Sequence, residues 1–300
     1  MKKIIVMIIV LGGQLAFGMD VPQRVPLELV LTNDMKKSLL IMAAETGGID
    51  QVRTFLDYGF DVNGDFNRKT PLVAAAENGH VEVVRLLLDR GADINAIAPD
   101  NNTALIVAAH RGQIEVVRLL LDRGADVNVA SGDGSTALMY AASFGTRPRQ
   151  FEIVLELLTF IPVAERKAIR ENVFGLLSAL KHKAAGEGLG RQMPSDIRKF
   201  IGQDVINKLV EEQMPKIMAQ ARLLTAARSN SGRTARDWAD LSNALDIIDL
   251  LNLDNPESQA ILQRQVEANI RRIINNAELV QAQPQAPQPY QPTAKRSKTE

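Results

Sequence analysis

Residues 70–80 read TPLVAAAENGH and residues 103–113 read TALIVAAHRGQ, two versions of one pattern that begin 33 residues apart. Each is followed by nearly the same second half, EVVRLLLDRGADIN at residues 82–95 and EVVRLLLDRGADVN at residues 115–128. A third copy begins TALMYAA at residue 136, and a more divergent one runs from SLLIMAA at residue 38 to YGFDVN at residue 63. Self-similarity at this period indicates stacked units that share one continuous core.

Each copy predicts two short helices and a turn. Thr70 can cap the first helix, and Pro71 fits its first turn, where the missing N–H is harmless. Gly79 ends this helix, an apolar side that includes Val83 and Val84 marks the second helix, and Gly91 ends it. The equivalent residues recur in the next copy. The acidic and amide residues that follow should turn the chain with side-chain to backbone hydrogen bonds; they are Asp93, Asn95, Asp126 and Asn128.

These motifs resemble the ankyrin repeat. The resemblance implies an all-α solenoid whose units each contain a hairpin loop, two antiparallel helices and a connecting loop, and it covers residues 32–160 as four repeats. The family's usual histidine after Thr-Pro-Leu is replaced by Val73, Ile106 and Met139, which predicts apolar packing there. The fourth unit has four extra residues between its helices, including Arg147, Pro148 and Arg149, and we expect a protruding loop.

The pattern stops after Phe160 and resumes at residues 229–253, where we predict a divergent fifth repeat. Thr234 takes the cap position, Ala239 the small contact position and Asn243 the glycine turn. The alternative is an unrelated amphipathic helix that matches by chance.

Residues 161–228 between these parts predict a helical insertion, a small subdomain with three apolar stripes. The stripes are Ile169, Val173, Leu176, Leu177 and Leu180; Ile197, Phe200, Ile201, Ile206, Leu209 and Val210; and Ile217, Ala221 and Leu224 in a helix that Pro215 opens. The glycine-rich stretch 186–190 lacks a preceding strand and favours a linker over a phosphate site. Residues 193–197, MPSDI, faintly resemble the opening of an F-box.

Residues 255–278 predict a helix that caps the open end of the stack. Its apolar stripe is Leu262, Val266, Ile270 and Ile273, and its polar face is Arg264, Glu267, Arg271 and Arg272. Residues 279–300 are rich in Pro and Gln and predict a disordered tail. Its KRSK run at residues 295–298 is a solvated terminus or a weak nuclear-import signal.

Residues 1–18 have the order of a secretory signal peptide. Lys2 and Lys3 precede an apolar run at residues 4–11, and Ala16-Phe17-Gly18 supplies a small-x-small cleavage site. The apolar stretch is too short for a membrane span, although an uncleaved anchor is the alternative. We expect a bacterial protein that is exported, periplasmic or secreted, with 33 basic and 35 acidic residues once the leader is removed.

The amino-acid composition excludes or disfavours several classes of function. Aromatic residues make up only 4% of the chain against 46% hydrophobic residues overall, which suits helices with Leu, Ile, Val and Ala cores. Thirty-five basic and 35 acidic residues cancel, so no global field favours a nucleic-acid partner. No cysteine is present, which excludes disulfides, thiolate metal sites and a Cys nucleophile. His80, His110 and His182 favour structural or solvent roles, and we expect no enzyme activity, cofactor or metal.

The resemblance to ankyrin repeats implies a monomeric protein-binding scaffold whose partner contacts a concave wall of hairpin tips and inner-helix ends. The candidate partner-binding residues are Phe66, Asn67, Lys69, Glu77 and Asn78; Asp100, Asn102, His110 and Arg111; and Asp133, Ser135, Ser143 and Phe144. Tyr140 is either a contact residue or packed against the next repeat. The chain could serve a host-associated bacterium as an effector. The alternatives are an activity in the insertion with the repeats as its docking arm, an F-box-like adaptor, or a structural periplasmic protein.

Overall fold

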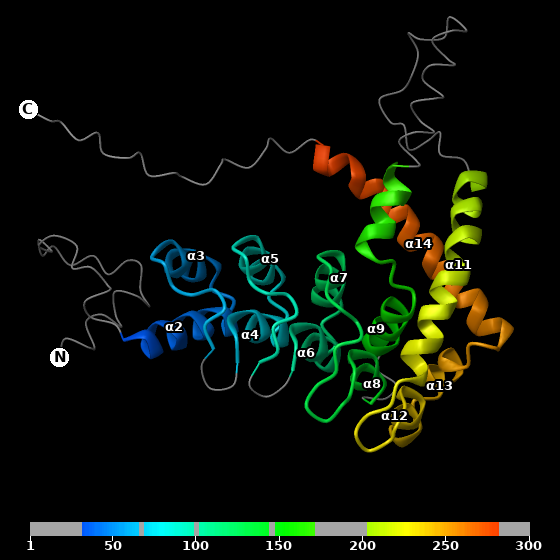
Figure 1. The fold of residues 1–300 in the computed structure, drawn as a ribbon, viewed down its shortest axis with the longest axis horizontal. Coiled ribbons are helices and arrows are strands. Elements are labelled where there is room, and N and C mark those ends of the chain that lie inside the picture. Colours follow the sequence, from blue (N-terminus) through cyan, green and yellow to red (C-terminus); the bar gives the residue numbers. More distant parts are fainter. Residues whose placement is uncertain (1–31, 66–68, 99–101, 144–147, 172–202, 282–300) are drawn as a thin grey trace, which may run out of the picture. The chain divides into compact units, whose positions relative to one another are not determined.

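The computed structural model describes residues 32–65, 69–98, 102–143, 148–171 and 203–281 (Figure 1). Within these ranges the elements are helices, and Ala130 and Thr136 form an isolated antiparallel bridge. The chain divides into two compact units. The first joins the residues up to Val163 with Gln213–Val266, and the second joins Ala164–Glu212 with Glu267–Glu300.

Four pairs of helices form most of the first unit. The inner helices are α2 (Asn33–Glu45), α4 (Pro71–Glu77), α6 (Ala104–Arg111) and α8 (Ala137–Ala142), and the outer helices are α3 (Ile49–Asp57), α5 (Val81–Asp89), α7 (Ile114–Asp122) and α9 (Pro148–Leu158). Each inner helix packs against the next inner helix and each outer helix against the next outer helix, which gives two rows (Figure 1). This is the arrangement of an all-α repeat solenoid.

The inner helices begin and end where the sequence predicts. The Thr70 hydroxyl accepts a hydrogen bond from the Val73 amide at 3.3 Å, and Thr103 does the same for Ile106. Gly79 and Gly112 follow these helices with φ of 77° and 75°. Side chains rarely adopt this left-handed conformation, so glycine makes the tight turn to the outer helix possible.

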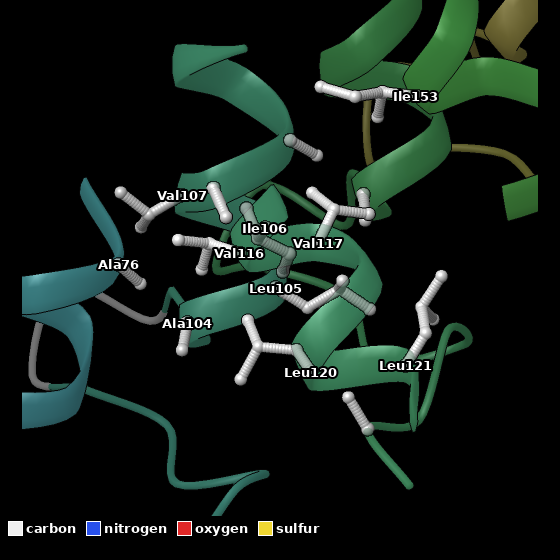
Figure 2. Packing of buried hydrophobic residues seen from close by; sticks show 14 of the residues in the cluster. Ala76, Ala104, Leu105, Ile106, Val107, Val116, Val117, Leu120, Leu121 and Ile153 are labelled. Carbon is white, nitrogen blue, oxygen red and sulfur yellow. The ribbon is translucent and has the colours of Figure 1, made fainter. Parts of the chain in front are cut away.

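Alanines and aliphatic side chains fill the space between the rows. The Ala74–Ala76 run of α4 is fully buried, so α4 can approach its neighbouring inner helices closely. Leu105 and Ile106 of α6 and Val117 and Leu120 of α7 form the next layer of the same core (Figure 2). Each such aliphatic side chain contributes about 1.5–3 kcal/mol by leaving water. Because every layer shares its residues with the next, the repeats stabilise one another.

The turns after the outer helices are joined between repeats by hydrogen bonds. Asp93 accepts from the Asn95 amide within its own turn at 3.0 Å, as predicted. The Asp93 amide in turn donates to Asn63 Oδ1 of the previous repeat at 2.9 Å, and the Asp126 amide donates to Asn95 Oδ1 at the same distance. The Asp and Asn residues therefore fix the register of successive repeats as well as the turn itself.

The prediction of a protruding loop in the fourth repeat is wrong for Pro148 and Arg149. Both belong to α9, which begins at Pro148 and is 11 residues long, whereas α5 and α7 have nine. Proline is well suited to the first helical position, because its fixed φ is helical and its missing N–H has no intrahelical partner there. Part of the extra length therefore lengthens the outer helix of this repeat. Arg147 lies outside the described residues.

A fifth helix pair follows the insertion in the first unit. It consists of α12 (Ala235–Leu241) and α13 (Leu245–Leu251), which pack against α8 and α9. Thr234 and Asp237 form a reciprocal capping box at the start of α12. Asn243, at the predicted turn position, has φ of 56° and is the one non-glycine residue with positive φ in the described part of the chain.

The insertion differs from the predicted subdomain. Pro215 does not open a helix: it lies inside α11 (Gln203–Ala226), which carries both Leu209 and Leu224 on its buried side. Ala221 and Leu224 belong to the core of the repeats, so the second half of α11 is part of the first unit. One continuous apolar stripe explains why the helix runs through the proline. The predicted features at residues 172–202 lie outside the described residues.

The second unit contains residues 164–171 of a helical segment and the ends of two long helices, α11 and α14 (Pro256–Gln281). Asn255 Oδ1 accepts from the Glu257 amide at 3.0 Å and so caps α14, whose predicted stripe, Leu262, Val266, Ile270 and Ile273, is buried. Leu262, in the part of α14 that belongs to the first unit, joins the core of the repeats.

Candidate functional site

The inner face is defined here as the surface made by the C-terminal ends of the inner helices and the hairpins that precede them. Stacking of equivalent helices brings these side chains into one row, one group for each repeat. In the described residues the inner face comprises Glu45, Lys69, Glu77, Asn78, His110, Arg111, Asp133, Tyr140, Ser143, Arg233 and Trp238.

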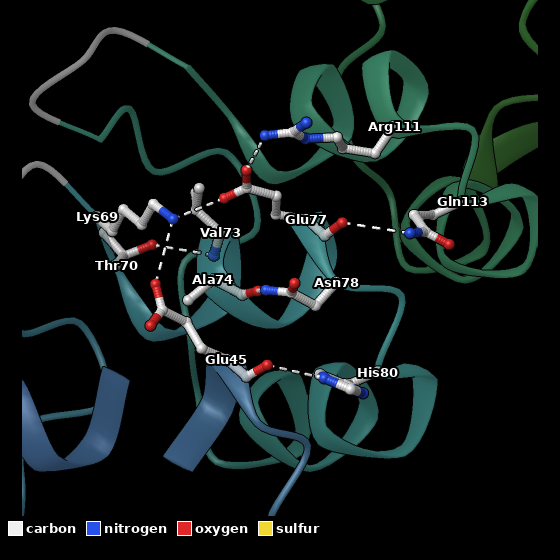
Figure 3. A network of polar contacts seen from close by, with 10 residues as sticks. All are labelled: Glu45, Lys69, Thr70, Val73, Ala74, Glu77, Asn78, His80, Arg111 and Gln113. Atoms are coloured by element: carbon white, nitrogen blue, oxygen red, sulfur yellow. Dashed lines mark hydrogen bonds and ion pairs between the residues drawn. The ribbon is translucent and has the colours of Figure 1, made fainter. Parts of the chain in front are cut away.

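Charged residues connect the first three repeats across this face (Figure 3). Lys69 Nζ lies 3.2 Å from Glu45 Oε1 of α2 and 2.7 Å from Glu77 Oε2 of α4. The Glu77 carboxylate also pairs with Arg111 of α6. Both Lys69–Glu45 and Arg111–Glu77 cross a repeat boundary, so the network stabilises the stack and orients the side chains that it presents.

The ionisation of this network follows from its hydrogen bonds. The bond to Glu77 raises the pKa of Lys69, although partial burial opposes the shift. Burial would raise the pKa of Glu77, but hydrogen bonds from Lys69 and Arg111 outweigh it and hold that pKa below its ordinary value. All three groups are therefore charged at neutral pH, and their charges are largely compensated by one another.

A second set of hydrogen bonds fixes the backbone of the inner-helix ends. His80 Nε2 lies 2.9 Å from the carbonyl oxygen of Glu45 in the previous repeat. Gln113 donates at 3.2 Å to the carbonyl of Glu77, and Gln150 donates at 3.3 Å to that of His110. His80 thus has the structural role that its position in the turn indicates. Carbonyls at helix ends lack intrahelical partners, so these bonds stabilise each repeat boundary.

Aromatic rings occupy the inner face in the third to fifth helix pairs. The His110 ring packs edge-on to Tyr140 with centroids 5.3 Å apart. Trp238 of α12 lies beneath the guanidinium of Arg233, whose Cζ is 5.2 Å from the ring centroid. Tyr140 and Trp238 are partly exposed and also pack against the core, so Tyr140 has the packing role considered for it, and its role in partner contact stays a prediction.

Asp133 organises the hairpin beside Tyr140. Its carboxylate accepts hydrogen bonds from the Ser131 hydroxyl, from the Ser135 amide at 2.9 Å and hydroxyl at 3.0 Å, and from the Tyr140 hydroxyl at 3.4 Å. These bonds outweigh the effect of burial and lower the pKa of Asp133. Ser135 is 2% exposed, so its assignment as a partner-binding residue is wrong: a serine that caps its own hairpin has no free surface.

The remaining predicted residues fall into two groups. Asn78 and Ser143 bond carbonyls of their own helices, Ala74 and Tyr140 respectively, and the carbonyl of Asn102 accepts from the Ala98 amide. Phe66, Asn67, Asp100 and Phe144 lie outside the described residues.

Sequence reasoning missed three residues of the inner face, Glu45, Arg233 and Trp238. Trp238 follows its cap, Thr234, by four positions, just as Tyr140 follows Thr136. Extending the repeat alignment from the cap to this position would have identified it.

The described residues contain no group of three or more His, Asp and Glu side chains placed to hold a metal ion. Within the same ranges, no helix combines the length and apolar character needed to cross a membrane. The inner face offers hydrogen-bonding, ionic and aromatic contacts, which are the means of protein recognition.

The protein-family model described as ankyrin repeats (3 copies) matches the chain over residues 25–98 and 96–165. No curated protein matches the chain significantly. The match covers the first four helix pairs. The family match therefore falls on the part of the chain whose described residues fold as an all-α repeat solenoid.

Proposed function

We propose that this protein is a non-enzymatic scaffold that binds a protein partner through the inner face. Ankyrin repeats suggest such a scaffold. The observation that carries the proposal is the row of partly exposed Arg111, His110, Tyr140 and Trp238 held at repeat boundaries by hydrogen bonds and ring contacts. Arg, Tyr and Trp dominate binding energy at protein interfaces, and a preorganised surface loses little entropy on association.

We propose further that α12 and α13 form a fifth ankyrin repeat. The hairpin before α12 supports this. Ser229 donates its amide to the Arg233 carbonyl at 2.9 Å, and Ser131 donates to Ser135 at the same distance in the fourth repeat. Gly232 and Gly134 occupy equivalent positions with φ of 79° and 78°. The inner face would then extend over five repeats.

The N-terminal segment supports export of the protein, to the periplasm or beyond, and a role as an effector that binds a host protein. Mass spectrometry of the protein from its native cells tests the first part: cleavage after Gly18 gives an N-terminus at Met19. An intact N-terminus in the cytoplasmic fraction would contradict export.

The binding proposal is tested by comparing two triple variants in pull-downs from the native environment. Asn78→Ala, His110→Ala and Arg111→Ala alter the inner face, whereas Arg53→Ala, Tyr58→Ala and Arg85→Ala alter exposed positions on the outer helices and the turn after α3. We expect the first set to lose the partner that the wild type retains and the second set to keep it. If both triple variants recovered the partner equally well, the inner face would not be the binding surface.

A further inference from the structure

The asparagine that joins the first repeat to the second is followed directly by glycine. Asn63 and Asn95 occupy equivalent places in successive turns, and each donates its amide at 3.0 Å to the carboxylate of the aspartate two residues earlier. The side-chain Oδ1 of each accepts a 2.9 Å hydrogen bond from a backbone amide of the following repeat. The two turns differ in the next residue, which is Gly64 in the first and Ala96 in the second.

An asparagine side chain can be attacked by the backbone nitrogen of the residue that follows it. Here the Gly64 nitrogen would bond to Asn63 Cγ, the Cγ–Nδ2 bond would break, and ammonia would leave with the proton of the Gly64 amide. The succinimide ring that remains is opened by water to give aspartate or isoaspartate. The reacting groups belong to neighbouring residues, so the step is intramolecular. A side chain on the second residue crowds this attack, and glycine has none.

The hydrogen bonds of Asn63 favour this reaction. Negative charge develops on Asn63 Oδ1 as the ring closes, and the Asp93 amide already donates to that oxygen at 2.9 Å. A donor fixed where charge develops stabilises the transition state without reorganisation. The leaving nitrogen Nδ2 has a long contact, 3.5 Å to the Gly91 carbonyl. Asn63 is exposed, and the 3.1 Å turn bond from the Gly64 amide to the Asp61 carbonyl is the bond that must open before the attack.

The second Asn-Gly pair of the chain, Asn78-Gly79, is held in the opposite way. Asn78 Nδ2 donates at 2.9 Å to the Ala74 carbonyl, so the leaving group is the atom that the fold holds firmly. Among the described residues, no donor bonds to Asn78 Oδ1, the oxygen that would become negative. The fold therefore favours the reaction at Asn63 over the reaction at Asn78.

We propose that Asn63 is a site of spontaneous deamidation through a succinimide formed with Gly64. An aspartate at this position adds a negative charge between Asp61 and Asp65 in the sequence. An isoaspartate adds a carbon to the main chain and displaces the oxygen that accepts from the Asp93 amide. That bond joins the first repeat to the second, so the modification weakens this repeat boundary as the protein ages, whichever partner the inner face binds.

The rates at the two Asn-Gly pairs test the proposal. The full-length protein is incubated at mildly alkaline pH, which favours deprotonation of the attacking amide, and tandem mass spectrometry then measures deamidation at each asparagine. In the folded protein, Asn63 should deamidate at least about tenfold faster than Asn78. In denaturant the two rates should converge, because the fold no longer distinguishes the pairs. Equal rates in the folded protein, or a faster rate at Asn78, would overturn the inference.

Two variants at the matched turn position separate the glycine from the fixed donor. Gly64→Ala should slow deamidation of Asn63 at least about tenfold, and alanine fits this turn because Ala96 occupies the same place in the second repeat. Ala96→Gly should create a second site at Asn95, whose Oδ1 has an equivalent donor. Circular dichroism establishes that both variants are folded. A folded Ala96→Gly protein in which Asn95 stayed intact would contradict the role of the fixed donor.

The effect on the repeat boundary has its own measurement. The Tm of the wild type should fall during the incubation in step with the isoaspartate found at residue 63, whereas the Tm of Gly64→Ala should stay at its starting value. If wild-type protein modified at Asn63 kept its Tm, the modification would not weaken the boundary between the first two repeats.

Discussion

The amide of Asn230 donates a 2.8 Å hydrogen bond to the carbonyl of Asp133, which lies nearly one hundred residues earlier in the chain. This bond joins the hairpin before α12 to the hairpin before α8. The two hairpins are therefore held in register although they lie far apart in the sequence. The insertion falls in the connection between an outer helix and the next hairpin, and its described part contributes Ala221 and Leu224 of α11 to the core of the repeats.

Asn243 should tolerate glycine but not a β-branched residue. Its φ of 56° is left-handed, where asparagine and glycine are accepted and valine is strained. We expect Asn243→Gly to leave the unfolding free energy within about 0.5 kcal/mol and Asn243→Val to lower it by about 1–2 kcal/mol. Urea unfolding followed by Trp238 fluorescence measures both. Equal stability of the two variants would argue against the left-handed turn.

Glu77 should contribute more to stability than a similar exposed glutamate. Its side chain is 17% exposed and bonds both Lys69 and Arg111, whereas Glu82 is 69% exposed and pairs only with Arg85 in the same helix. Glu77→Gln should lower the unfolding free energy by about 1–2 kcal/mol, and Glu82→Gln by less than about 0.5 kcal/mol. Chemical denaturation compares them, and indistinguishable midpoints would show that the network adds no stability.

Arg118→Ala should lower the free energy of unfolding more than Arg123→Ala does. Arg118 Nε lies 2.7 Å from the carboxylate of Glu156, a residue of α9 whose side chain is 3% exposed. Arg118→Ala removes one hydrogen-bond donor of this buried carboxylate, which also accepts from Gln265, and should cost about 1–3 kcal/mol. Arg123 pairs at 2.8 Å with the exposed Asp89, so Arg123→Ala should cost less than about 1 kcal/mol. A smaller loss in Arg118→Ala than in Arg123→Ala, by thermal or urea unfolding, would contradict this order.

His110 should make the protein less stable on mild acidification. Burial, and then the charge of Arg111, lower its folded pKa below the ordinary 6.5. Below pH 6.5 the unfolded chain therefore binds a proton more readily than the folded chain, and stability falls until the pH reaches the folded pKa. Between about pH 7.5 and about pH 5.5, the Tm of the wild type should drop more than that of His110→Gln. If the Tm of the wild type and of His110→Gln fell equally with pH, His110 would have the same pKa in the folded and unfolded chains.

The repeats were predictable because each position has a local physical reason. Thr70 predicts the start of a helix because its hydroxyl can cap the first turn. Asn243 predicts a turn between two helices because asparagine accepts the left-handed conformation. Pro148 and Pro215 were misjudged because the sequence alone does not say whether a proline starts, ends or lies within a helix; the surrounding packing decides.

The inner face was less predictable than the fold. The cross-repeat pairing of Lys69, Glu77 and Arg111 depends on the rotation between repeats, which no single repeat encodes. The repeat alignment predicts that Ser135 is a surface residue, but it is buried and its hydroxyl donates a 3.0 Å hydrogen bond to Asp133 Oδ2.

Site-specific photo-cross-linking in the native cells tests the central claim that the inner face binds a protein partner. A photoreactive amino acid is placed at Asn78 or Arg111 on the inner face, and at Arg53 or Arg85 on the outer helices, all of them exposed. The account predicts one discrete adduct from positions 78 and 111 and none from positions 53 and 85. Adducts from the outer positions alone, or equally from all four, would contradict it.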